Sequence, residues 1–288
     1  MWAIANKTCV ITGATAGIGQ ATAVALAERG ARVVIVCRNQ EKGAAVVGEL
    51  AKRAPAVTPA MVVADLSSQA EVRRAAAEVL ALCPRIDVLL NNAGAVFDRR
   101  ETTVDGLERT FGLNHLSYFL LTQLLLERVL ASAPARIINV ASNAHRRGRM
   151  RFDDLQREQD FSSMGAYAQS KLANILFTRE LSRRVAGRGV TVNCLHPGVI
   201  ASSFAQGVGG PLGLFFKIAR PFLMNSEDGA KTSVSLAVAP ELESVTGEYF
   251  EKSKVARMSS HAASDEDARR LWEISERLVQ AAVRSSAL

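Results

Sequence analysis

Short runs of apolar, often β-branched residues alternate along the 288-residue chain with longer segments of helical character. These runs occupy residues 8–12, 31–37, 58–65, 86–91, 135–142 and 190–196, with a helix-length segment between each pair. Near-continuous apolar strands separated by helices are typical of a parallel sheet with both faces covered, because right-handed crossovers place the helices there. The pattern predicts one doubly wound α/β domain over residues 1–288, with a parallel sheet of about seven strands.

Two helix starts and one unusual segment refine this organisation. Ser68 with Glu71 matches a capping box, and Ser264 precedes the acidic residues that would open a C-terminal helix at about 264–284. Residues 198–224 are glycine-rich and then strongly apolar. We interpret about 199–225 as a substrate lid; the alternative is a loop followed by a core helix.

Charge and composition narrow the classes of partner. The net charge of +7 and the pI near 9.5 would suit nucleic acid, anionic lipid or a polyanionic cofactor. The densest basic run, HRRGRMR at 145–151, has no aromatic side chain for base stacking, so we expect a solvated loop and no nucleic-acid partner. The four cysteines and four histidines show no metal-ligand spacing, so no metal site is expected.

The N-terminus enters a strand-like run almost immediately, which leaves no room for a signal peptide or a membrane anchor. The chain also contains no uncharged apolar run of 18 residues. We therefore expect a soluble, cytoplasmic protein.

A glycine-rich turn stands between the first predicted strand and the first predicted helix. It contains Gly13, Gly17 and Gly19. In a βαβ unit the pyrophosphate of a dinucleotide sits on the helix N-terminus at such a turn. The spacing is G-x-x-x-G-x-G rather than G-x-G-x-x-G, and glycines alone often mark only a turn. The placement between strand and helix nevertheless favours a Rossmann-type dinucleotide site.

The end of the second predicted strand indicates which dinucleotide. An acidic residue there accepts a hydrogen bond from the ribose 2′-hydroxyl, whereas an arginine pairs with a 2′-phosphate. The strand ends in Cys37-Arg38, without a carboxylate. We expect NADP(H) rather than NAD(H); the alternative is that Arg38 only caps the strand end in solvent.

Polar residues at several predicted element positions suggest catalysis. Tyr167 and Lys171 lie four residues apart on a predicted helix and share one face. A nearby ammonium lowers the pKa of a phenol, which makes a tuned proton donor. Asn114 interrupts the apolar stripe of a predicted helix around 105–125, where a buried amide needs partners. Ser142 stands at the sheet edge where open α/β folds place their ligands.

Taken in order, these motifs resemble the short-chain dehydrogenase/reductase family over essentially the whole chain. They are the glycine turn, NNAG at 91–94, Asn114, Ser142, YxxxK at 167–171 and PG at 197–198. The resemblance implies a catalytic tetrad. Tyr167 would exchange the proton, Ser142 would hold the reacting oxygen, and Asn114 would position a water of the proton relay. Lys171 would bind the nicotinamide ribose and lower the pKa of the tyrosine.

The resemblance also implies the cofactor contacts. Asp65 and Leu66 would flank the adenine, residues 91–94 would line the cofactor, and Val199 with Ser202 would meet the carboxamide. Ser202 replaces the threonine that is more common in the family and keeps its hydroxyl. The implied cofactor-binding residues are Gly13, Thr15, Gly17, Ile18, Gly19, Arg38, Asp65, Leu66, Asn91, Ala93, Gly94, Tyr167, Lys171, Pro197, Gly198, Val199 and Ser202.

Further features resemble the retinol dehydrogenase-like branch: the insertion between Ser142 and Tyr167, CRN at 37–39, HPGV at 196–199 and the C-terminal tail. This implies an NADP(H)-dependent carbonyl reductase or alcohol dehydrogenase that interconverts a bulky lipophilic ketone or aldehyde and its alcohol. Apolar lid residues could line the substrate pocket, although residues 211–224 could instead lie on a membrane surface. These lid residues are Leu212, Leu214, Phe215, Phe216, Ile218, Phe222 and Leu223.

Two other functions stay open. One is a reductase of a carbon–carbon double bond, as in protochlorophyllide reductase. The other is a dinucleotide-binding sensor or scaffold without catalysis, against which the unbroken tetrad argues. The resemblance further implies a homodimer or homotetramer assembled through helices at roughly 105–130 and 163–186.

Overall fold

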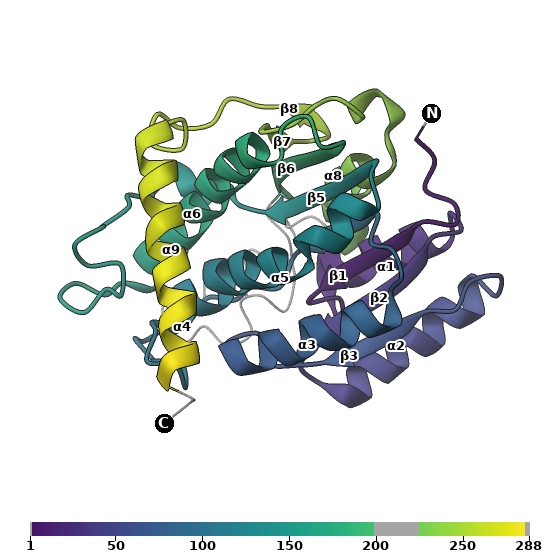
Figure 1. Cartoon of the computed structure of the whole chain (residues 1–288), viewed down its shortest axis with the longest axis horizontal. Helices are drawn as coiled ribbons and strands as arrows, with labels where there is room; N and C mark the ends of the chain where they lie inside the picture. The colour runs from purple at the N-terminus through teal and green to yellow at the C-terminus, as the bar shows by residue number, and fades with distance from the viewer. Residues whose placement is uncertain (1, 199–224, 286–288) are drawn as a thin grey trace.

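A computed structural model of the chain describes residues 2–198 and 225–285. Figure 1 shows a sheet covered by helices on both sides, so the predicted doubly wound α/β fold is confirmed. The strands are β1 (Thr8–Thr12), β2 (Arg32–Cys37), β3 (Ala60–Val63), β4 (Val88–Asn91), β5 (Ala135–Val140), β6 (Val190–His196), β7 (Tyr249–Glu251) and β8 (Lys254–Val255). The α-helices are α1 (Gly17–Ala27), α2 (Gln40–Arg53), α3 (Gln69–Leu82), α4 (Arg109–Phe111), α5 (Ser117–Ala131), α6 (Ser163–Arg184), α8 (Ser226–Val238) and α9 (Asp265–Ser285).

Within the described residues the sheet has eight strands in the order β3-β2-β1-β4-β5-β6-β7-β8. Neighbours from β3 to β7 pair in parallel, whereas β8 pairs antiparallel with β7. The six strands located in the sequence are all present, and β7 brings the parallel strands to the expected seven, although its position was not predicted. The two-residue strand β8 was not predicted; it follows a tight turn at Lys252 and Ser253, both with positive φ. The winding reverses between β1 and β4, which is where open α/β sheets bind ligands.

The two faces of the sheet are covered by different sets of helices (Figure 1). One apolar cluster joins the sheet to α1, α2 and α8, and the other joins it to α3, α5, α6 and α9. The central strands β1, β4 and β5 are buried throughout, in agreement with their largely apolar sequences.

Ser68 and Ser264 are confirmed as helix N-caps, but the Glu71 carboxylate pairs with Arg74 and does not complete the predicted capping box. The Glu71 amide donates to Ser68 Oγ at 3.4 Å, and the Asp267 amide donates to Ser264 Oγ at 3.1 Å. Each bond satisfies one backbone donor that has no partner inside its helix. Helix α9 consequently begins at Asp265, as its sequence indicated.

Helix α9 crosses over α6 and α5 (Figure 1). The ring of Trp272 on α9 lies 4.9 Å from that of Phe119 on α5 and 5.9 Å from that of Phe177 on α6, between centroids. These are the two helices through which oligomers were expected to assemble. Assembly stays a prediction; α9 covers part of the surface of these two helices.

Candidate active site

The glycine turn after β1 has the geometry that a phosphate group requires. Gly13 and Gly17 have φ of +67° and +59°, which side-chain-bearing residues rarely adopt. A Cβ on Gly19 would lie 2.5 Å from the Gly13 carbonyl oxygen, so the turn folds tightly against the first turn of α1. Ala16, the N-cap of α1, offers no side-chain hydrogen bond to the helix. The first amide groups of α1 therefore receive no hydrogen bond from the N-cap side chain, which leaves them available as donors to an anionic ligand.

The NNAG segment after β4 holds this turn in place. Asn92 Nδ2 donates to the carbonyls of Thr12 and Gly13, at 2.9 and 3.1 Å. The Thr12 hydroxyl accepts from the amides of Asn92 and Ala93. Asn92 is thus a supporting residue for the site, and the NNAG motif was the signal for it.

The expectation that Asn91 lines the cofactor is wrong for its side chain. Asn91 is completely buried, and its Nδ2 donates to Thr122 Oγ1 and Asn139 Oδ1, both at 2.9 Å. This amide points into the interior between β4, β5 and α5, because the alternation of a strand turns it away from the ligand edge. Asn91 therefore stabilises the sheet beneath the site.

The structure places the other expected cofactor residues around this edge. Arg38 is exposed at the end of β2 and forms no hydrogen bond or ion pair with the residues that the structure describes. Asp65 Oδ1 accepts from the amide and hydroxyl of Ser67, and Leu66 beside it is buried. Thr15 and Ile18 lie half-buried in the glycine turn. The exposed guanidinium of Arg38 has the geometry to pair with a 2′-phosphate.

The polar residues of the tetrad converge beside the NNAG segment. Lys171 Nζ donates to the main-chain carbonyl of Val140, at the end of β5, at 3.0 Å. The same Nζ lies 5.6 Å from the ring centroid of Tyr167. A Cβ on Gly94 would lie 3.1 Å from Asn114 Oδ1 and 3.5 Å from Lys171 Nζ. The glycine turn, NNAG and the tetrad residues Asn114 and Lys171 therefore lie next to one another at the C-terminal edge of the sheet.

Ser142 lies opposite the tyrosine and is held by its own loop. Its hydroxyl accepts from the Ala144 amide at 3.2 Å, and it hydrogen-bonds with Tyr167. The Ser142 carbonyl accepts from His145 Nδ1 at 2.7 Å. Because the Tyr167 hydroxyl and Ser142 are in direct contact, one oxygen atom of a substrate could contact both.

The helix expected around 105–125 is present from Arg109 to Ala131, but it contains a π-helical turn that the sequence did not indicate. Residues Gly112–Leu116 form this turn between α4 and α5. The Leu113 carbonyl accepts from Ser117 Oγ, and the Asn114 carbonyl accepts from Asn174 Nδ2. Side-chain donors thus bind main-chain carbonyls of this turn that would accept from backbone amides in a regular α-helix. Such turns are frequent at functional sites.

Asn114 is buried in this turn, and its side chain is fully engaged. Its Oδ1 accepts from the Ala95 amide and its Nδ2 donates to the Ala95 carbonyl, both at 2.9 Å. A further bond reaches Ser170 Oγ at 3.1 Å. The observed role of Asn114 is thus to attach the segment after NNAG to α6. Its role in positioning a water stays a prediction.

Burial dominates the electrostatics of Tyr167 and Lys171. It raises the pKa of Tyr167 to about 12, with the hydrogen bond from Ser142 acting in the opposite direction. It also lowers the pKa of Lys171 to about 7. Lys171 is not among the causes of the Tyr167 shift, because burial also destabilises the ammonium form of the lysine, and the expectation that Lys171 lowers the tyrosine pKa stays a prediction.

Some expected positions fall at or beyond the described residues. Pro197 and Gly198 follow β6, with Gly198 at a φ of +95°. Val199, Ser202 and the predicted lid at about 199–225 lie outside the described residues, apart from Asn225, which caps α8. Among described residues there is no cluster of histidine, cysteine or acidic side chains that could hold a metal ion, and no helix long and apolar enough to cross a membrane.

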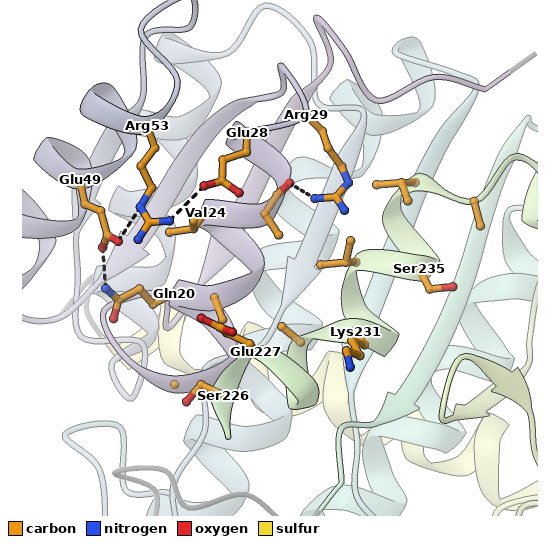
Figure 2. A pocket seen from close by; sticks show the side chains of 17 residues that line it. Gln20, Val24, Glu28, Arg29, Glu49, Arg53, Ser226, Glu227, Lys231 and Ser235 are labelled. Carbon is orange, nitrogen blue, oxygen red and sulfur yellow. Dashed lines mark hydrogen bonds and ion pairs between the residues drawn. The ribbon is translucent and has the colours of Figure 1, made fainter. Parts of the chain in front are cut away.

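A cavity of about 760 Å³ lies away from the tetrad, between α1 and α8. Figure 2 shows its polar wall, where Arg53 pairs with Glu28 and Glu49 at 3.0 and 3.1 Å. Its floor is apolar, with Val24 among the side chains. None of the four tetrad residues lines it, so the tetrad and not this cavity defines the candidate active site.

Sequence reasoning missed several buried polar residues around the tetrad, among them Tyr118, His145, Ser170 and Asn174. Tyr118 lies with its ring centroid 5.8 Å from Lys171 Nζ, and its hydroxyl has no partner among the described residues. Asn174 could have been found, since it is a polar residue on the Tyr167–Lys171 face of a long, almost wholly buried helix.

Acid is expected to destabilise the protein through His115 in the π-helical turn. Burial lowers the pKa of His115 from 6.5 to about 4, so between these values the unfolded state binds a proton that the folded state does not. The free energy of unfolding therefore falls as the pH falls through this window, by about 2 kcal/mol between pH 7.5 and 5. Urea unfolding at both pH values measures the loss.

The variant His115→Gln isolates this contribution. Burial also lowers the pKa of His145 and His196, so some acid sensitivity should remain. Between pH 7.5 and 5, the free energy of unfolding of the variant should fall by about 2 kcal/mol less than that of the wild type. Equal losses in the two proteins would contradict the assignment to His115.

The arrangement of a glycine turn at a helix N-terminus beside a Ser-Tyr-Lys group defines a class of nicotinamide-dependent oxidoreductase. Residues 7–210 match the family described as short chain dehydrogenase, and the chain belongs to that family. Mouse retinol dehydrogenase 12 is 44% identical over 94% of this chain and 86% of its own length. Human retinol dehydrogenase 13 is 43% identical over 96% of this chain and 85% of its own length. The chain is accordingly retinol dehydrogenase-like.

Solved structures show the same fold. A protein from Mycobacterium Paratuberculosis has a TM-score of 0.78 and 32% identity, covering 97% of this chain and 96% of its own. The Pseudomonas aeruginosa RhlG/NADP active-site complex has a TM-score of 0.69 and 30% identity, covering 86% of this chain and 95% of its own. The latter is a complex with NADP.

Proposed function

We propose that the protein is an NADP(H)-dependent oxidoreductase that interconverts a bulky lipophilic ketone or aldehyde and its alcohol. The observation that carries the proposal is the contact between the hydroxyls of Tyr167 and Ser142, with Lys171 beside them, at the edge where the glycine turn opens. The lipophilic substrate class is supported by the similarity to retinol dehydrogenases.

When bound, the nicotinamide supplies or accepts the hydride. The protein residues then handle the proton and the geometry. With a pKa raised to about 12 by burial, Tyr167 stays protonated at neutral pH and is ready to donate to a carbonyl oxygen. Ser142 holds the same oxygen in place. This preorganisation in a buried site stabilises the charge that develops on oxygen during reduction.

Lys171 supports the tyrosine after proton transfer. Its Nζ, anchored on the Val140 carbonyl, remains close enough to the phenol ring to stabilise a phenolate. A lysine pKa of about 7 in the protein alone means that any negative charge brought nearby would favour its ammonium form. The site is thereby suited to reduction near neutral pH.

The proposal is tested by following nicotinamide absorbance with purified protein, NADPH and NADH in parallel, and three carbonyl compounds. These are a retinal, a steroid ketone and an aromatic polyketide-like ketone. Oxidation of NADPH well ahead of NADH, with an alcohol as the product, supports the proposal. Saturation of a ring double bond, or no oxidation despite demonstrated cofactor binding, contradicts it.

Arg38 is expected to select NADPH. Its guanidinium is exposed and forms no ion pair with described residues, so it can pair with the 2′-phosphate. Arg38→Ala should weaken NADPH binding about tenfold, as for loss of a charge-assisted hydrogen bond at an exposed site, and leave NADH binding within about twofold. Titration of cofactor fluorescence measures both.

A matched control distinguishes a specific contact between Arg38 and the 2′-phosphate from a general effect of removing one positive charge. Arg188 is also exposed but lies between α6 and β6, at the opposite edge of the sheet. Arg188→Ala should leave both affinities unchanged. Equal weakening of NADPH and NADH by Arg38→Ala would contradict a 2′-phosphate contact.

A further inference from the structure

A chain of buried hydrogen bonds connects helix α9 with the tetrad. Ser275 Oγ on α9 lies 3.0 Å from His115 Nε2, and His115 Nδ1 lies 3.4 Å from Asn174 Oδ1 on α6. All three side chains are fully buried. None of them is among the residues that the family resemblance implies for catalysis or cofactor binding.

Asn174 is the point at which this chain reaches the tetrad. Its Nδ2 donates to the main-chain carbonyl of Asn114 at 2.9 Å and to that of Val140 at 3.3 Å. Lys171 Nζ donates to the same Val140 carbonyl at 3.0 Å. The Asn174 side-chain amide therefore binds the backbone of Asn114, and it shares the Val140 carbonyl as an acceptor with Lys171.

Donor and acceptor chemistry determines the direction of every bond in the chain. Both carbonyls can only accept, so the amide nitrogen of Asn174 faces them and its oxygen faces His115. That oxygen needs a donor, which assigns the His115 proton to Nδ1 and leaves Nε2 to accept from the Ser275 hydroxyl. The assignment at Nε2 requires a neutral ring, which burial provides by lowering the pKa of His115 to about 4.

We propose that Asn174 is a positioning residue for the reaction, and that Ser275 and His115 lock its amide in the orientation that holds the Asn114 carbonyl and the anchor of Lys171. Helix α9 is then part of the catalytic apparatus as well as of the core. The proposal rests on the proposed function, because it assigns Asn114 and Lys171 to the reaction. A residue that only filled space would affect stability without affecting turnover or the ionisation of Lys171.

The first test replaces Ser275 by alanine in the full chain. The lost hydrogen bond should free the His115 ring and lower kcat about three- to tenfold, with the cofactor Kd within about twofold of the wild type. Ser182→Ala is the matched control: this α6 serine is also buried, but its hydroxyl donates only to the Arg179 carbonyl, at 2.8 Å. Wild-type kcat in Ser275→Ala, or an equal loss in Ser182→Ala, overturns the proposal.

The second test needs neither substrate nor cofactor. Asn174→Asp places a carboxyl group of the same size beside the Val140 carbonyl that Lys171 uses. The ionised form should raise the pKa of Lys171 by about one unit or more, as read from ¹⁵N NMR of labelled lysine. Among the described residues, the other titratable groups that face Lys171 are Tyr118 on α5 and Tyr167 on α6. An unchanged lysine titration overturns the proposal.

The two tests keep the proposals separate. If the wild type reduces no carbonyl compound, the proposed function fails, whereas the NMR titration still decides whether Asn174 acts on Lys171. If the wild type reduces carbonyls but both variants behave like the wild type, only the positioning role fails.

Discussion

Replacement of Tyr167 by phenylalanine is expected to lower the rate of carbonyl reduction about 10²- to 10⁴-fold, the range for loss of a positioned general acid. The ring is only 8% exposed, so phenylalanine can occupy the same space while the hydroxyl that contacts Ser142 is lost. Cofactor affinity should stay within about threefold, since the hydroxyl is not required to hold the dinucleotide at the glycine turn. Single-turnover kinetics with NADPH measure the chemical step.

Tyr118→Phe is the matched control for this prediction. Tyr118 is also a buried tyrosine, and its ring lies 5.8 Å from Lys171 Nζ, close to the 5.6 Å for Tyr167. Its hydroxyl has no hydrogen-bond partner among the described residues, so its removal should leave turnover and stability nearly unchanged. Retained turnover in Tyr167→Phe, or a comparable loss in Tyr118→Phe, would contradict the assignment of the proton donor.

Replacement of Gly13 by alanine is expected to impair both folding and cofactor binding. The position has a φ of +67°, and a Cβ there would lie 2.7 Å from Ala93 Cα, which is backbone and cannot rotate away. Left-handed strain of about 1–2 kcal/mol adds to overpacking of about 1–3 kcal/mol. We expect a loss of about 2–5 kcal/mol in the free energy of unfolding, measured in urea.

The same substitution should displace the turn from β4 and weaken NADPH binding at least about tenfold, because close approach of the turn to the phosphates is what glycine allows. Gly106→Ala provides the control. Its φ is +75°, but a Cβ there would meet nothing within 4 Å, so it should show only the backbone strain. If Gly13→Ala lowers the free energy of unfolding no more than Gly106→Ala does, the contact with Ala93 is not what requires glycine at position 13.

The buried polar network shows where sequence reasoning reached its limit at this site. Asn114 was recognised because it interrupts an apolar stripe, but the π-helical turn around it was not, since that turn depends on a side-chain donor 60 residues away, Asn174. Asn91 was assigned to the cofactor from its motif, whereas the strand turns its side chain inward. The π-helical turn was missed because hydrogen bonds between distant segments choose among local conformations that the sequence alone leaves equally available.

The pKa shifts of Tyr167 and Lys171 could not be predicted from the sequence either. An i, i+4 spacing places Tyr167 and Lys171 on one face but says nothing of their hydration. Burial raises the pKa of one and lowers that of the other, and burial depends on how α5, α6 and the sheet close around them.

By itself the sequence determined the doubly wound fold, the helix caps, the glycine turn and the residues of the tetrad. These follow from periodicity, from backbone conformations that only certain residues adopt, and from motifs in a set order. Only the tertiary structure decided the π-helical turn, the packing of α9 over α5 and α6, the orientation of Asn91 and the path of hydrogen bonds from Ser275 to Lys171. The physical reason is that each of these is a contact between segments far apart in the chain, whose free energy is realised only once the whole core has assembled.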